Sequence, residues 1–149
     1  MAYTDLLKGR ASVTGQIYLV TTVTSGRERL FTNLCYGRIV VRALHCETTA
    51  ARAATLAYVV MPDHLHWLVQ LNAGGDLSDV VKRVKARSAF QINRTRESSR
   101  AVWQPKFHDH ALRREEDLQA VARYVVRNPL RAGLVRRIND YPLWDAVWV

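Results

Sequence analysis

Two histidines separated by one residue, in the run His64-Leu65-His66, form the pattern best suited to chemistry in this sequence. Residues two apart on a β-strand project from the same face, so both imidazoles would leave the strand side by side while Leu65 enters the core. Neutral imidazole is a common ligand of divalent metals. The motif therefore predicts half of a metal site and makes the chain a candidate metalloenzyme.

A tyrosine and an asparagine four residues apart, Tyr124 and Asn128, form a second pattern. They lie on a predicted helix over 115–128, where residues four apart share a face. A phenol and an amide would thus project together from one rigid element. On helix geometry alone, an ordinary core-edge tyrosine and a helix-terminating asparagine are the commoner explanation.

The positive charge of the chain is concentrated in its second half. The whole sequence has 22 Lys and Arg against 13 Asp and Glu, a net charge of +9. Residues 76–137 contain 15 basic and 7 acidic residues, net +8, which leaves 7 and 6 elsewhere, net +1. Such asymmetry favours a polyanionic partner, most often nucleic acid, and the alternative is a solvated basic surface.

Other features narrow the class of protein. A length of 149 residues suits one domain over 1–149, and the chain has no apolar run of about 18 residues that could span a membrane. Met1 to Arg10 has no apolar signal-peptide core, so we expect a cytoplasmic protein. Cys35 and Cys46 lie about three turns apart on one predicted helix, too far for a disulfide. The sequence has no Gly-rich loop followed by Lys-Ser or Lys-Thr, so ATP use is not indicated. It has no C-x-x-C pair, so a structural zinc site is not indicated either.

The alternation of apolar residues predicts an α+β fold. Strands are expected over 16–24, 55–61, 64–71 and 101–112, and helices over 34–49, from 77 to a polar break at 97–100, and over 115–128. The order β-α-β-β-α-β matches the ferredoxin-like pattern with an antiparallel sheet. The additional C-terminal helix carries the tyrosine. The aromatic tail over 140–149 is expected to pack back on the body.

The two motifs in this order resemble the IS200-type single-tyrosine transposases, in particular the REP-associated branch of these HUH endonucleases, where U is a hydrophobic residue. The resemblance covers about residues 13–145. Its segments are Met61-Pro-Asp-His64-Leu-His66-Trp-Leu-Val69, Tyr124-Val-Val-Arg-Asn128-Pro-Leu-Arg131-Ala-Gly133-Leu-Val135, Trp103-Gln-Pro-Lys-Phe-His-Asp109 and Gly15-Gln-Ile-Tyr-Leu-Val-Thr21.

The resemblance implies a role for each residue of the two motifs. His64 and His66 match the ligands of a Mg²⁺ or Mn²⁺ ion, and Tyr124 matches the nucleophile. Asn128 stands where the family often has a glutamine ligand, and its shorter side chain would bind the metal directly or through a water. The implied activity is cleavage and rejoining of single-stranded DNA near hairpins through a 5′-phosphotyrosine. Imidazole must be neutral to bind metal, so activity should fall below about pH 6.5.

The basic second half would then meet the DNA. The residues expected to line its path are Lys82, Arg83, Lys85 and Arg87 on one helix and Arg123, Arg127 and Arg131 near the tyrosine. The tryptophans Trp67, Trp103, Trp144 and Trp148 could stack on unpaired bases, although core packing is commoner. Family members act as monomers or homodimers, and we expect association with the nucleoid.

Three alternatives remain open. A second pair, His108-Asp109-His110, could hold the metal instead or touch DNA, although it lies near Pro105 on a predicted edge strand. The chain could also be a DNA-hairpin-binding protein that does not cleave. It could finally be a metal-dependent phosphodiesterase that uses water, with Tyr124 merely structural.

Overall fold

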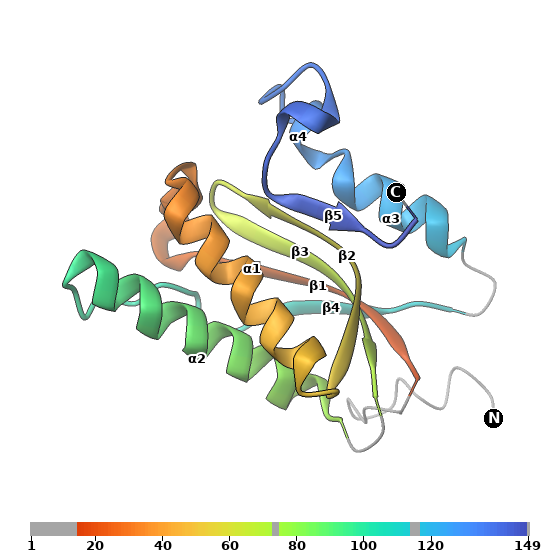
Figure 1. The fold of residues 1–149 in the computed structure, drawn as a ribbon, viewed down its shortest axis with the longest axis horizontal. Helices are drawn as coiled ribbons and strands as arrows, with labels where there is room; N and C mark the ends of the chain where they lie inside the picture. Colours follow the sequence, from red (N-terminus) through yellow and green to blue (C-terminus); the bar gives the residue numbers. More distant parts are fainter. Residues whose placement is uncertain (1–14, 73–74, 114–116, 149) are drawn as a thin grey trace.

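The computed structural model describes residues 15–72, 75–113 and 117–148 (Figure 1). Residues 1–14 lie outside the described residues, and with them the segment Met1 to Arg10 that has no apolar signal-peptide core. Residues 114–116, where the last helix is predicted to begin, also lie outside them. The strands are β1 (Ile17–Val23), β2 (Ala53–Met61), β3 (His64–Leu71), β4 (His108–Ala111) and β5 (Trp144–Ala146). The helices are α1 (Leu34–Thr49), α2 (Leu77–Arg96), α3 (Leu118–Val126) and α4 (Asn128–Arg131), with 3₁₀ turns at Ser25–Arg27, Leu30–Thr32 and Ile138–Asp140.

The five strands form one antiparallel sheet in the order β4-β1-β3-β2-β5. The first four strands have the ferredoxin-like arrangement, so the predicted fold class is confirmed. The aromatic tail packs back as expected and also adds the short strand β5 beside β2, which the sequence did not predict. No helix among the described residues is long and apolar enough to cross a membrane.

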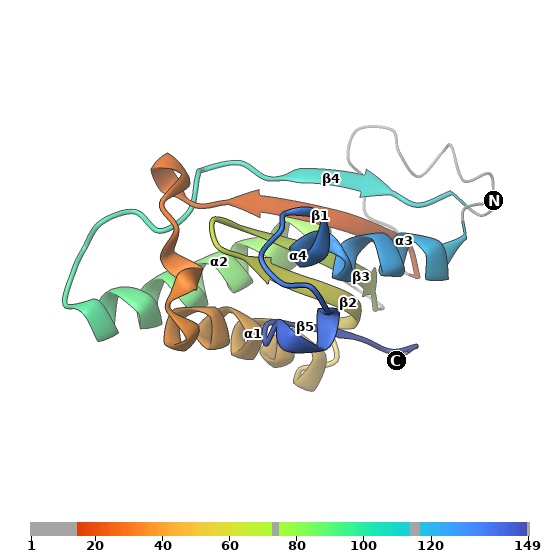
Figure 2. The same ribbon diagram turned by 90° about the horizontal axis from the view of Figure 1, so that it is seen from above.

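The two faces of the sheet are covered by different helices. Leu65 and Trp67 of β3 belong to the core formed with α1 and α2, whereas Leu68 packs with Ala122 of α3. Figure 1 shows α1 and α2 running alongside each other, apart from α3 and α4, and Figure 2 shows β4 and β5 at opposite edges of the sheet. Because side chains alternate along a strand, His64 and His66 face the same side as Leu68. The histidine pair therefore lies on the α3 face.

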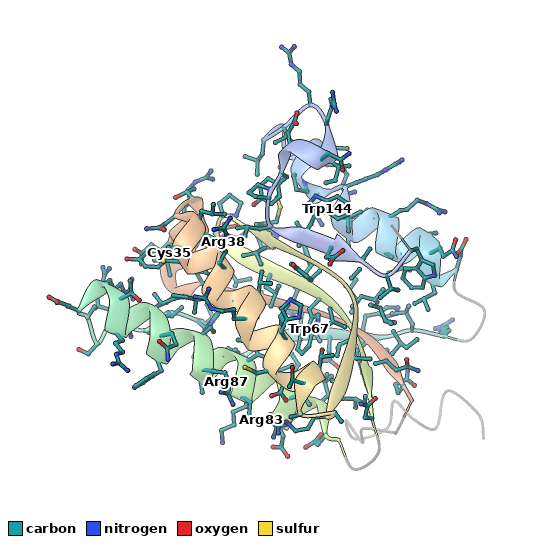
Figure 3. The ribbon with its side chains drawn as sticks, viewed as in Figure 1. Cys35, Arg38, Trp67, Arg83, Arg87 and Trp144 are labelled. Atoms are coloured by element: carbon teal, nitrogen blue, oxygen red, sulfur yellow. The ribbon has the colours of Figure 1, made fainter. Side chains whose placement is uncertain are left out.

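Buried polar contacts hold the opposite face together. Glu47 of α1 is 1% exposed and accepts hydrogen bonds from Arg52 (2.7 Å) and Arg83 of α2 (2.9 Å). Figure 3 shows Trp67 behind α1, and its indole donates to Thr55 Oγ1 at 3.0 Å. The Trp103 indole likewise donates to Ser88 Oγ at 2.9 Å. Both tryptophans are thus core residues.

Two predicted elements are shorter in the structure. The strand predicted over 101–112 is regular only in β4, preceded by a single bridge between Thr24 and Trp103, because Pro105 cannot donate a ladder hydrogen bond. The predicted last helix ends at Val126, and α4 follows with Pro129 near its start. Asp117 caps α3 by accepting from the Ala120 amide at 3.1 Å.

Candidate metal and tyrosine site

The two histidines of β3 lie close together on the α3 face. Their ring centroids are 4.7 Å apart, and the planes meet edge to face at 81°. Both side chains are half-buried, while Leu65 between them is 1% exposed, as the alternation predicted. A rigid strand thus presents two imidazoles to one small volume.

Each histidine is oriented by a partner at Nδ1. The Thr21 hydroxyl lies 2.8 Å from His66 Nδ1, and Thr21 stands opposite His66 in the β1–β3 register. Asp63 Oδ1 lies 2.7 Å from His64 Nδ1, and Arg27 Nε donates to Asp63 Oδ2 at 3.2 Å. With both Nδ1 atoms engaged, the Nε2 atoms are the nitrogens available to a metal.

The protonation states suit metal binding. Burial, followed by the charges of His64 and Arg131, lowers the pKa of His66 from 6.5 to about 4, so this imidazole is neutral near pH 7. Burial alone would raise the pKa of Asp63, but the hydrogen bond and charge of His64 and of Arg27 outweigh it and lower that pKa. Asp63 is therefore an ionised acceptor for the His64 N–H.

Helix α3 packs beside the histidines. Val125 is 1% exposed and packs against Val59 and Met61 of β2, which stand opposite His66 and His64 in the sheet. Tyr124, the preceding residue, is 61% exposed. Tyr124 is therefore not packed at a core edge, and its ring is accessible from outside the protein.

The amide of Asn128 has its orientation fixed. Its Nδ2 donates to Val125 O at 3.0 Å, which leaves the side-chain oxygen as the atom able to bind a cation. The described residues contain no cluster of three or more His, Cys, Asp or Glu. Two imidazoles must therefore be supplemented by a neutral oxygen ligand or by water, and the Asn128 side-chain oxygen is the candidate for the former. The donor set fits Mg²⁺ or Mn²⁺, which accept oxygen ligands and retain waters.

Comparison with known proteins places the chain in a family. The family model described as "Transposase IS200 like" matches residues 12–128. The chain belongs to the IS200-like transposase family. A REP-associated tyrosine transposase of Escherichia coli K12 is 30% identical over 87 residues, covering 58% of this chain and 50% of that protein. A candidate REP-associated tyrosine transposase of Haemophilus influenzae is 31% identical over 98 residues, covering 59% of this chain and 56% of that protein. The chain thus spans about half the length of these relatives.

Solved structures of transposases share the fold. A REP-associated tyrosine transposase bound to a REP hairpin superposes with a TM-score of 0.74 at 24% identity, covering 89% of this chain and 77% of that one. A candidate transposase of Deinococcus radiodurans gives a TM-score of 0.57 at 20% identity, covering 81% and 95%. These similarities confirm the mixed α and β architecture of an IS200-like transposase.

The rival histidine pair of this IS200-like chain lies on the same sheet face. His108 stands opposite Thr21 and His110 opposite Leu19, so both imidazoles project toward the α3 side, from the edge strand β4. Two strand spacings separate His108 from His66, about 10 Å between Cα atoms. Both are exposed. The pair thus lies beside the candidate site on the same face, and the metal prediction stays with His64 and His66.

The predicted DNA-binding residues divide between the two sheet faces. Arg123, Arg127 and Arg131 are exposed on α3 and α4, on the histidine side. The predicted cluster on α2 lies on the other side, where Figure 3 shows Arg83 and Arg87. Lys82 and Arg87 are exposed there.

The two remaining α2 residues make intramolecular contacts, a role that the sequence did not predict. Arg83 donates to Glu47, and Lys85 Nζ donates to the carbonyls of Gln104 (2.6 Å) and Lys106 (3.2 Å). Burial lowers the pKa of Lys85. Both side chains connect α2 to neighbouring segments, so their cations are already partnered within the fold.

The sequence did not predict the residues that hydrogen-bond to the two histidine Nδ1 atoms. Thr21 and Asp63 both fall inside the quoted motifs, yet neither received a role. The signal was available for Asp63, which directly precedes His64 at the hairpin turn. Thr21 could have been found only from the β1–β3 register, which a single sequence does not specify.

Proposed function

We propose that this chain is a single-stranded DNA transposase that cleaves and rejoins strands near hairpins through a 5′-phosphotyrosine at Tyr124. His64, His66 and Asn128 would hold the Mg²⁺ or Mn²⁺ ion. The observation that carries the proposal is the placement of an exposed tyrosine on the helix that packs beside two oriented imidazoles. The hairpin substrate is inferred from the relatives, one of which was solved with a REP hairpin.

The chemistry follows from the residues. The Tyr124 oxygen attacks the phosphorus in line and its proton passes to water, while the bond from phosphorus to the 3′-oxygen breaks and that oxygen takes a proton from water to leave as a 3′-OH. Bound Mg²⁺ or Mn²⁺ would polarise the phosphate and offset the charge of the transition state. The phosphotyrosine keeps the energy of the phosphodiester, so a second 3′-OH can reverse the step without ATP. We propose that the protein acts on nucleoid DNA in the cytoplasm, as a monomer or homodimer.

The decisive experiment uses labelled single-stranded oligonucleotides that carry REP-type hairpins from the source genome, with Mn²⁺. A denaturing gel should show a covalent protein–DNA band for the wild type. Tyr124→Phe should abolish the band and the cleavage while oligonucleotide binding persists. The matched control is Tyr36→Phe on α1, across the sheet from the site, which should retain the band.

The same gel separates the alternatives. A water-using phosphodiesterase would release cut product without a covalent band and would survive Tyr124→Phe. A protein that only binds hairpins would retard the oligonucleotide but give no metal-dependent cut as wild type. Either result would overturn the nucleophile assignment.

A further inference from the structure

Arg131 covers the ring of the proposed nucleophile. Its guanidinium carbon lies 3.8 Å from the centroid of the Tyr124 ring, and its Nη2 donates to the Tyr124 carbonyl at 2.7 Å. In one uninterrupted helix, residues seven apart are separated by about 10 Å along the axis. The break between α3 and α4 allows Arg131 to fold back over the tyrosine.

The contact over the ring leaves most of the guanidinium donors of Arg131 available. Stacking uses the flat face of the group, whereas its five N–H donors lie in the plane and point outward. One nitrogen bonds to the Tyr124 carbonyl, and Arg131 is exposed. No other hydrogen bond of this guanidinium is seen among the described residues, so its remaining donors are available to a ligand.

The same cation lies near the histidines. The charge of Arg131 contributes to the low pKa of His66, after burial and His64. Arg131 thus contacts the Tyr124 ring and lies near enough to His66 for its charge to act on that imidazole. Arg123 and Arg127 are also exposed on this side, yet no ring contact to Tyr124 is seen for either among the described residues.

We propose that Arg131 positions the Tyr124 ring and binds the phosphate under attack. The inference rests on the proposed function. A planar guanidinium can donate two parallel hydrogen bonds to phosphate, which lysine cannot do. Holding the ring and the phosphate with one group would bring the phenol oxygen and phosphorus together in a fixed orientation. Charge that develops on the phosphate oxygens would meet a cation already in place.

A structural role must be separated from this one. The Tyr124 carbonyl lies in the last turn of α3, where carbonyls lack helical partners, so Arg131 also serves as a C-terminal cap. Loss of the cap would lower the melting temperature. It would not by itself slow covalent bond formation in folded protein saturated with DNA.

The test compares Arg131→Met, Arg131→Lys and the control Arg42→Met, an exposed cation on α1 across the sheet. The rate of the covalent band is measured with saturating hairpin oligonucleotide and Mn²⁺, below the melting temperature of each variant. We expect Arg131→Met to slow it about 10²-fold, as for loss of one preorganised donor. Arg131→Lys should recover DNA affinity but not the rate, and Arg42→Met should match the wild type.

Two further readouts need neither metal nor cleavage. Nitration of Tyr124 by tetranitromethane, located by mass spectrometry, should accelerate in Arg131→Met because one ring face is uncovered. Oligonucleotide binding in EDTA should show a salt slope reduced by about 0.7, the value for one lost contact to single-stranded DNA.

Each result bears on one claim. An unchanged rate in Arg131→Met, or full recovery of the rate in Arg131→Lys, would refute the positioning role. If the wild type forms no covalent band, the proposed function fails. In that case, an unchanged nitration rate and an unchanged salt slope in Arg131→Met would refute the contacts of Arg131 separately.

Discussion

The hydrogen bonds at the two Nδ1 atoms determine which imidazole nitrogens can reach a cation. Thr21 and Asp63 fix these bonds, at 2.8 Å and 2.7 Å. Such outer partners commonly change metal affinity because they fix the tautomer and the ring orientation of a ligand. Thr21 offers a precise test, since valine has nearly the same shape without the hydroxyl.

We expect Thr21→Val to weaken Mn²⁺ binding about 10-fold to 100-fold, measured by isothermal titration calorimetry at pH 7.5. The matched control is Thr22→Val, the neighbouring position on the other face of β1. Thr22 is 1% exposed, and its hydroxyl lacks a hydrogen-bond partner among the described residues. This control should keep metal affinity and gain about 1 kcal/mol in stability. Equal Mn²⁺ affinity in both variants would contradict the role of Thr21.

The low pKa of His66 predicts how stability depends on pH. Its pKa in the folded state is about 4, below the ordinary 6.5, so between these values the unfolded chain binds more protons. Stability should therefore be lost as pH falls from about 6.5 to 4, by up to about 3.5 kcal/mol at about 1.4 kcal/mol per pKa unit. Thermal unfolding in EDTA would measure this change, and His66→Gln should flatten it. A parallel pH profile in His66→Gln would assign the loss to other groups.

At this scale, the sequence predicted the chemical groups but not their partners. His64, His66, Tyr124 and Asn128 follow from spacing and family resemblance, and the structure brings them to one sheet face. Thr21 lies 45 residues before His66, and only strand register joins them. Asn128 as a metal ligand stays a prediction.

Among the secondary-structure elements, a buried carboxylate connects α1, α2 and the start of β2. Glu47 is 1% exposed and is shared by Arg52 and Arg83. Burial alone would raise its pKa, but these two guanidinium groups outweigh burial and lower it. The helix layer therefore depends on a buried carboxylate whose two guanidinium partners are partly exposed.

Glu47→Gln should destabilise the protein by about 2 to 4 kcal/mol, because two arginines lose a buried counter-charge. Chemical denaturation at pH 7 measures the change. Glu97→Gln, at an exposed position after α2, is the control and should stay within about 0.5 kcal/mol of the wild type. If Glu47→Gln also changed the free energy of unfolding by less than about 0.5 kcal/mol, water would be solvating the two arginines in place of the carboxylate, and the buried ion pairs would not stabilise the fold.

Periodicity predicted the long elements well and the short ones poorly. Helices α1 and α2 and strands β1 to β3 have enough residues for an apolar pattern to emerge. β5 has three residues in an aromatic tail, too few for any period. The break before α4 reflects Pro129, which has no amide N–H to donate to a helix, and the turn back toward Tyr124 was not predicted.

For the whole molecule, charge counts along the sequence do not reveal which surface carries each charge. Residues 76–137 hold nearly all the excess, but the fold sends α2 to one sheet face and α3 with α4 to the other. Single-stranded DNA that reaches Tyr124 must meet the α3 side. A contact with α2 requires a longer substrate that passes around the sheet, and a hairpin provides such length.

This arrangement predicts different effects for two paired substitutions. Arg123→Met with Arg127→Met should weaken binding of both a short single strand and a hairpin oligonucleotide, and should reduce the salt slope for the single strand by about 0.7 per lost contact. Lys82→Met with Arg87→Met should weaken only hairpin binding, because these cations lie across the sheet from the histidines. Fluorescence anisotropy in EDTA at several salt concentrations measures both affinities. If both double variants lost single-strand binding equally, DNA would reach Tyr124 by a path over α2. The α2 cations would then bind single strands as well as hairpins, contrary to this prediction.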